Sequence, residues 1–169
     1  PQRASPQFVE ALFDDFSDTF DSKLSALSYA VPSIIGETAR ALVSLRGGEP
    51  FSSAIDAGCG TGLVGPHLRP LVAGQLVGVD LSHKMLARAA TLLAHGSTQP
   101  LYDKLLASDL LGLSLPALSD ASTPFELLVA ADVLVYFGDL GPLLAAFAGL
   151  SGSGATLVFS CELASATEA

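Results

Sequence analysis

Residues 52–71 read SSAIDAGCGTGLVGPHLRPL, and this stretch decides the fold. A short apolar run at 53–57 ends in a glycine-rich turn, and a helical pattern follows at 63–71. Glycines in such a turn adopt positive φ angles and let the main chain approach a ligand closely. The next helix offers free N–H groups at the positive end of its dipole. The stretch therefore predicts a strand, a ligand-binding turn and a helix.

The remaining chain repeats this alternation of short apolar runs and helical patterns. The expected strands are 53–57, 75–80, 105–108, 126–131 and 155–161, and the helices between them are 63–71, 83–95 and 140–150. Such alternation is typical of an α/β, Rossmann-like fold, an open and mainly parallel sheet with helices on both faces. We expect the first strand to be central and a ligand to bind at the carboxyl ends of the strands.

About fifty residues precede the first strand, and they have a helical pattern. The apolar residues that recur at helical spacing are Phe8, Leu12, Phe13, Phe16 and Phe20. We interpret this stripe as core, or as a lid that docks on the core. A second helix is expected from Pro32 to about Leu45. Residues 1–50 are thus a helical cap, and residues 51–169 the ligand-binding unit of the same structural domain.

Composition narrows the functional classes. The chain has 169 residues, which suits one domain, and no run of about 18 uncharged apolar residues predicts a membrane span. The net charge of −9 and the scattered Lys and Arg argue against nucleic acid as a partner. The two cysteines lack metal-ligand or disulfide-scaffold spacing, so we expect no metal and a reducing, cytoplasmic location. An organelle is the alternative, because the chain begins at Pro1 and a targeting segment could precede it.

The glycine turn fits two cofactors. The spacing Gly60-x-Gly62-x-x-Gly65 matches the dinucleotide fingerprint, whereas Asp56-x-Gly58-x-Gly60-x-Gly62 matches the S-adenosylmethionine (SAM) loop. An acid at the end of the second strand would bind the ribose hydroxyls of either cofactor. That residue, at position 80, therefore does not decide between them.

Three acidic residues favour SAM over a dinucleotide. Asp56 inside the turn would repel a pyrophosphate but suits the cationic amino group and sulfonium of SAM. Asp109 follows the third strand, where it could accept a hydrogen bond from the adenine amine. Asp132 ends the fourth strand in LLVAADVLVYFGDL, a block with no obvious use in a dehydrogenase. An NAD(P)-binding oxidoreductase is the runner-up, and it lacks a Tyr-x-x-x-Lys or a His/Asp relay.

Together these residues resemble a class I SAM-dependent methyltransferase. Five segments are similar, in order, to predicted methyltransferases associated with tetratricopeptide repeats: LFDDFSDTFDSKLSALSYAVP, DAGCGTGLVGPHLRPL, LVGVDLSHKML, LYDKLLASDL and AADVLVYFGDLGPLLAAF. The resemblance covers Phe8 to about Glu162. It implies SAM as cofactor and methyl transfer to a small molecule or a protein. The alternative is a SAM-binding scaffold or regulatory domain without turnover.

The resemblance also assigns site residues by position. The residues that it places at the methionine part of SAM are Asp56, Gly58, Gly60, Gly62, Asp132 and Val133. The glycines would pass under the cofactor, and Asp56 would hold its amino group through water. At the other end, Asp80 would take the ribose hydroxyls and Leu81 would pack on adenine. Asp109 and Leu110 would border the adenine.

The catalytic residues are less defined. Transfer of a sulfonium methyl is chiefly a matter of proximity and alignment, so a base is needed only if the acceptor must lose a proton. The candidates are Tyr136, the strongest, then His67 and Tyr29; Tyr29 would also close the site from the N-terminal helices. Such methyltransferases normally continue past the fifth strand with a helix and an antiparallel hairpin. We expect the sheet to lack that hairpin and to expose an edge, which a homodimer or a swapped element could cover.

Overall fold

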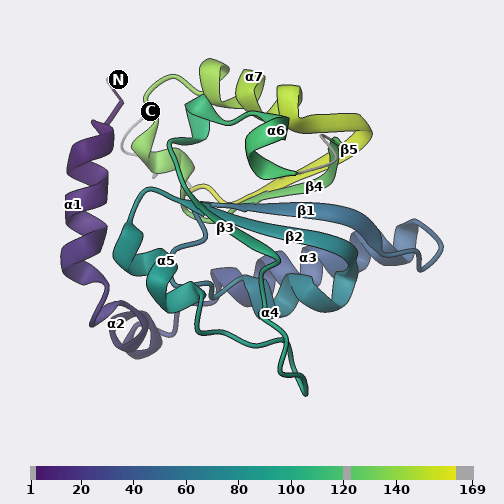
Figure 1. Cartoon of the computed structure of the whole chain (residues 1–169), viewed down its shortest axis with the longest axis horizontal. Helices are drawn as coiled ribbons and strands as arrows, with labels where there is room; N and C mark the ends of the chain where they lie inside the picture. Colours follow the sequence, from purple (N-terminus) through teal and green to yellow (C-terminus); the bar gives the residue numbers. More distant parts are fainter. Residues whose placement is uncertain (1–2, 120–122, 163–169) are drawn as a thin grey trace.

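The structure is a computed structural model that describes residues 3–119 and 123–162. Its sheet has five parallel strands in the order β3-β2-β1-β4-β5 (Figure 1). The strands are β1 (Phe51–Ala57), β2 (Val72–Asp80), β3 (Lys104–Ala107), β4 (Phe125–Ala130) and β5 (Ser151–Phe159). The first strand is central, as predicted, and strand order reverses beside it. A ligand site is expected at this switch point.

Helices cover both faces of the sheet (Figure 1). On the lower face in this view lie α3 (Val31–Leu45), α4 (Gly65–Leu68) and α5 (His83–Ala89). On the upper face lie α6 (Leu115–Leu118) and α7 (Gly141–Leu150). The predicted Rossmann-like α/β architecture is confirmed. No helix in the described ranges is both long and apolar enough to cross a membrane.

Strand β1 alternates between two hydrophobic cores. Ala54 packs in the core under α3, α4 and α5, whereas Ile55 and Ala57 pack in the core under α6 and α7. Successive strand residues point to opposite faces, so Asp56 points with Ala54 toward the α4 and α5 layer. A carboxylate on this face has to find its partners inside the protein.

The N-terminal region forms three helices where the sequence predicted two. Helix α1 (Pro6–Phe16) and α2 (Phe20–Ala26) are separated by a turn, and both lie beyond the carboxyl edge of the sheet (Figure 1). The break falls on the polar run 17–19. There the Ser17 hydroxyl donates to the Asp14 carbonyl (3.0 Å), a local bond that competes with a regular helix. The predicted helix that begins near Pro32 is confirmed as α3. We call residues 3–30 the lid.

Three other predicted boundaries were wrong. The helix expected at 83–95 ends at Ala89, because the chain turns back and the Leu101 N–H donates to the Leu92 carbonyl (2.9 Å). The helix expected at 63–71 is shortened to α4 and a following 3-10 turn, η1 (Arg69–Leu71). Pro70 would lie in the interior of the expected helix, where it lacks the N–H donor and its ring clashes with the carbonyl of residue 66, so α4 ends before it. The last strand begins at Ser151, earlier than expected.

Candidate functional site

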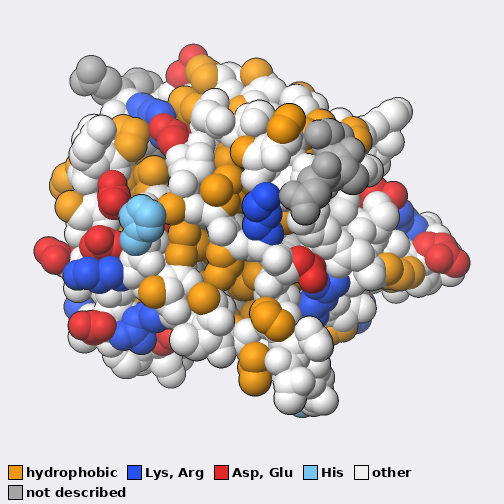
Figure 2. All heavy atoms as spheres, in the orientation of Figure 1, with side chains coloured by type: hydrophobic (Ala, Val, Ile, Leu, Met, Phe, Trp, Pro, Cys, Tyr) orange, Lys and Arg blue, Asp and Glu red, His pale blue; other side chains and the backbone are white. Residues whose placement is uncertain are grey.

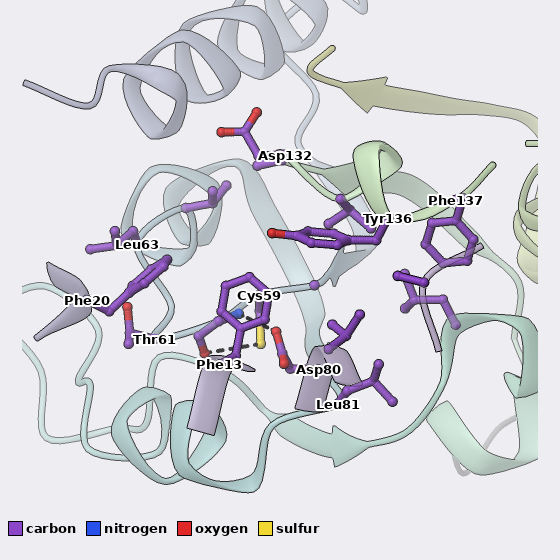
Figure 3. A pocket seen from close by; sticks show the side chains of 18 of the residues that line it. Phe13, Phe20, Cys59, Thr61, Leu63, Asp80, Leu81, Asp132, Tyr136 and Phe137 are labelled. Carbon is purple, nitrogen blue, oxygen red and sulfur yellow. Dashed lines mark hydrogen bonds between the residues drawn. The ribbon is translucent and has the colours of Figure 1, made fainter. Parts of the chain in front are cut away.

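A cavity of about 250 Å³ lies between the carboxyl ends of the strands and the lid (Figure 3). The predicted site residues that line it are Gly58, Gly60, Asp80, Leu81, Asp109, Leu110, Asp132, Val133, Tyr29 and Tyr136. In Figure 3 the ring of Tyr136 extends into the middle of the cavity, with Asp132 on one side and Asp80 on the other. Residues far apart in the sequence therefore meet in one site.

Asp80 holds the glycine loop to the second strand. Its Oδ2 accepts from the Gly60 N–H (2.8 Å), and its Oδ1 accepts from the Ser82 N–H (2.9 Å). Burial raises the pKa of Asp80, and these backbone hydrogen bonds oppose that rise. Each carboxylate oxygen has a second lone pair, so Asp80 can also accept from ribose hydroxyls at the cavity wall.

The loop after β1 is compact because Gly58 has no side chain. Gly58 has φ 72°, and a Cβ built there would lie 2.3 Å from Cγ2 of Val133. The N–H groups of Gly58 and Cys59 both donate to the Val79 carbonyl, at 2.7 and 3.0 Å. The main chain can thus approach both a ligand and the β4 loop closely.

Asp109 is engaged by the lid. Its Oδ1 accepts from the Arg3 guanidinium (2.6 Å) and from the Leu111 N–H (3.0 Å). Partial burial acts to raise the pKa of Asp109, but the hydrogen bonds from Arg3 and Leu111 lower it overall. The guanidinium also lies 4.7 Å from the ring centre of Phe137. The expected adenine-binding acid is therefore ionised and tied to the N-terminal segment.

Asp132 is held from two directions. It has φ 54°, which is uncommon for a residue other than glycine, and such backbone conformations concentrate at functional sites. Its N–H donates to the Ser160 hydroxyl (2.7 Å), which in turn donates to Oδ1. The Tyr29 hydroxyl donates to Oδ2 (2.6 Å), so the lid closes on Asp132.

Neither tyrosine of the cavity is a ready base. Burial, and then the hydrogen bond to Asp132, raise the pKa of Tyr29 far above its ordinary value. Burial, and then the charges of Asp132 and Asp80, raise the pKa of Tyr136. Both hydroxyls keep their protons at neutral pH and act as hydrogen-bond donors. The Tyr136 ring also packs edge-on against Phe13 of the lid, with centroids 5.6 Å apart.

Further polar contacts fasten the lid to the sheet domain. The pairs are Asp14 with Ser82 and with the Lys84 N–H, Asp18 with Arg88 (2.7 Å), and Asp21 with Thr61 (2.6 Å). The hydrogen bond from Ser82 is the main cause that lowers the pKa of Asp14. Figure 2 shows charges of both signs side by side on the edge where α1, α2 and α5 lie. The lid is therefore fixed by short polar contacts as well as by aromatic packing.

Three predicted site residues do not line the cavity. Gly62 has φ 92°, and the side on which a Cβ would stand packs against Leu92 and Tyr102. Asp56 is 1% exposed and accepts from the Tyr102 hydroxyl (2.6 Å). His67, a catalytic candidate, packs its side chain against Gly36 of α3, where a Cβ would lie only 2.5 Å from the His67 Cβ, and it is not part of the cavity lining.

Sequence reasoning missed several residues of the site. Arg3 and Ser160 were not assigned roles, and Phe13 was assigned only to the apolar stripe and not to the cavity. These residues come from the lid and from the segment after β5. No spacing links them to the glycine loop. Tyr102 stood within a segment that carried the family resemblance, so a signal was available there.

The fold and the site define a class of protein. A glycine loop after the central strand, an acid after the next strand and a cavity at the carboxyl edge form a class I, SAM-dependent methyltransferase domain. Residues 55–157 match the protein family described as "Methyltransferase domain". The chain belongs to this family. The association with tetratricopeptide repeats stays a prediction.

Solved structures share this fold. The magnesium protoporphyrin IX methyltransferase of Synechocystis PCC 6803, with bound S-adenosylhomocysteine, is 19% identical over 86% of this chain and 68% of its own (TM-score 0.65). DesVI of Streptomyces venezuelae is 23% identical over 83% and 55% (TM-score 0.63). A SAM-dependent methyltransferase of Clostridium acetobutylicum is 21% identical over 84% and 56% (TM-score 0.63). The chain thus spans little more than half of the last two. No curated protein sequence matches it.

The residues of this cavity fit SAM, the cofactor of the class. The Synechocystis enzyme has also been crystallised with SAM itself. In the present chain Asp80 lies at the cavity wall where a ribose would bind, and the missing side chain of Gly58 leaves room beside Val133. A buried oxygen of Asp56 has no hydrogen-bond partner among the described residues, which suits a cationic ligand group nearby.

Proposed function

We propose that this chain transfers the methyl group of SAM to a small, uncharged acceptor with an apolar or aromatic body, bound beneath the lid. The single observation that carries the proposal is the lining of the cavity on the lid side. Its apolar members are Ala4, Pro6, Val9, Phe13, Phe20 and Leu24. A roof of this kind favours an apolar ligand over a long polypeptide segment.

Charge supports the same acceptor class. Among the described residues, Arg3 is the one charged side chain that the lid contributes to the cavity, and Asp109 already neutralises it. An anionic acceptor would meet the carboxylates of Asp80 and Asp132 without a free cation. Burying an unpaired negative charge there is costly, so an anionic acceptor is disfavoured, and the apolar lining favours an uncharged one.

The residues of the chain supply alignment and exclusion of water. Bound SAM brings an electrophilic methyl group, and proximity alone can supply much of the rate enhancement. The Tyr136 hydroxyl remains protonated, so in this proposal it donates the hydrogen bond that orients the acceptor. The Tyr29 hydroxyl already donates to Asp132, so it helps to close the site. Phe13 and Phe20 close over the site, with their rings 6.1 Å apart in an edge-to-face arrangement.

The test is a transfer assay with methyl-labelled SAM. Neutral aromatic hydroxyl, thiol and ring-nitrogen compounds would be compared with their carboxylated analogues and with a protein lysate. Label in the neutral compounds is expected, and Phe13→Ala should raise the acceptor KM more than the cofactor KM. Label confined to protein would refute the small-molecule acceptor. Tight SAM binding with no labelled product in any pool would favour the scaffold alternative.

A further inference from the structure

We propose that Tyr102 is a positioning residue for the amino group of SAM. Its hydroxyl holds one oxygen of the Asp56 carboxylate and leaves the other oxygen to accept from the cofactor's ammonium, directly or through one water. This inference rests on the proposed function, because SAM is the ligand that brings the ammonium. It gives a role to the one predicted acid that lies behind the cavity wall.

The contact between the two residues is buried and specific. Asp56 is 1% exposed on β1, and Tyr102 is 4% exposed in the segment before β3. The Tyr102 Oη donates to Asp56 Oδ2 at 2.6 Å. Asp56 Oδ1 is buried and has no partner among the described residues. A buried oxygen of this kind is costly unless it is paired, so a ligand cation that reaches it gains binding energy.

The chain leaves space for the Tyr102 ring at three glycines. A Cβ on Gly65 would lie 2.5 Å from the Tyr102 Oη and 2.7 Å from Cζ. A Cβ on Gly62 would lie 3.1 Å from Cε2, and one on Gly78 would lie 3.1 Å from Cδ1. Two of these glycines belong to the loop segment that suggested a dinucleotide. The phenol therefore reaches Asp56 through a slot that any larger residue would narrow.

The charged surroundings of Asp56 set the pH dependence of this arrangement. Burial raises the pKa of Asp56 to about 7, the hydrogen bond from Tyr102 opposes the rise, and the charge of Asp80 adds to it. Cys59, Tyr29 and Tyr102 also face this carboxylate, and their raised pKa values keep them neutral. Among these four neighbours of Asp56, Asp80 is therefore the one that carries a charge.

The pH dependence of SAM binding follows from the direction in which the pKa of Asp56 is shifted. The ammonium binds the ionised carboxylate, so SAM affinity should fall as pH falls through about 7. Loss of the Tyr102 hydroxyl removes an interaction that lowers the pKa of Asp56. In Tyr102→Phe the loss of affinity should therefore begin at a higher pH, by about one unit, if one charge-assisted hydrogen bond is lost.

The experiment compares two ligands on the wild-type chain and on Tyr102→Phe. Calorimetry is run from pH 6 to 9 with SAM and with 5′-methylthioadenosine, which keeps the adenosine but has no amino acid part. In the variant, the Kd of SAM at neutral pH should rise about tenfold and its pH profile should shift upward. The Kd of 5′-methylthioadenosine should not change.

Each other outcome has a defined meaning. An equal loss for both ligands, or no shift in the pH profile, would overturn the positioning role and leave SAM binding intact. Absence of binding by both ligands to the wild-type chain would instead remove the proposed function. Asp56→Asn, which keeps the shape but not the charge, is the second variant if Tyr102→Phe does not fold. It should abolish the pH dependence for SAM and spare 5′-methylthioadenosine; a retained pH dependence would also overturn the proposal.

Discussion

Asp80→Asn is the most informative single substitution in the cofactor site. The two carboxylate oxygens of Asp80 accept separate backbone N–H groups, from Gly60 at 2.8 Å and from Ser82 at 2.9 Å. Asparagine has one carbonyl oxygen, so its amide nitrogen would face one of those donors. Losing a hydrogen bond to a charged acceptor costs ~1.5–3 kcal/mol. We expect the free energy of unfolding to fall by about that amount.

The same substitution should weaken the binding of SAM. The ribose hydroxyls lose a charged acceptor, so the Kd of SAM should rise ~10- to 100-fold in calorimetry. Asp15→Asn is the matched control, because Asp15 is exposed on α1 and its substitution changes the net charge by the same amount. That control should alter neither stability nor affinity.

A second ligand pair separates the ribose contact from the support of the loop. Wild-type protein should bind adenosine more tightly than 2′-deoxyadenosine, whereas Asp80→Asn should bind the two alike. If the variant keeps the preference for adenosine and loses affinity for both, Asp80 only anchors the loop. Unchanged SAM affinity in a folded variant would refute the assignment of Asp80 to the cofactor site altogether.

Three further substitutions probe the loop and the lid. Gly58→Ala should lower the free energy of unfolding by ~2–4 kcal/mol in urea titrations. Adding Val133→Ala to the same chain should recover the part of that loss that is due to the 2.3 Å contact. A loss below ~0.5 kcal/mol for Gly58→Ala would contradict the required positive φ and close contact. Arg3→Ala should speed SAM dissociation in stopped-flow measurements without unfolding the domain, since it frees Asp109; an unchanged rate would show that the pair does not latch the lid. Tyr29→Phe should lower kcat more than cofactor affinity, and equal effects on both would argue for a purely structural role.

The sheet was predictable because its information is local. The inner strands β1, β2 and β4 are mostly buried on both sides, so each appears as a short apolar run between turn residues. Strands β1 through β4 were found within about three residues. The helix expected at 83–95 failed for the opposite reason. Ala89 is followed by residues with helical propensity, but the pairing of Leu92 with Leu101 overrides it. Long-range contacts of this kind leave no periodic signal.

Most of the site residues that could be predicted from the sequence lie at the end of a strand or just after it. Asp80 ends β2, and Asp109 and Asp132 each stand two residues beyond the end of a strand. Parallel strands bring such positions to one edge. Arg3 precedes α1 and Phe13 lies on it, and both reach the same cavity only through the side-chain packing of the lid. Asp56 also follows from its strand, but its contact with Tyr102 depends on the path of the segment before β3. The chemistry was thus read from the sheet, whereas closure of the site was expected only at Tyr29 and from the Phe stripe, and the contact of Arg3 was not expected.

The ambiguity of the glycine turn has a physical origin in this structure. Gly58 is required by its positive φ and by Val133, which belongs to the cofactor side of the loop. Gly62 and Gly65 instead border the ring of Tyr102 behind the loop. The spacing that resembles a dinucleotide fingerprint therefore combines a glycine loop for the ligand with a slot for a buried tyrosine. Because that tyrosine holds the acid facing the cofactor's amino group in our proposal, both sets of glycines serve one cofactor.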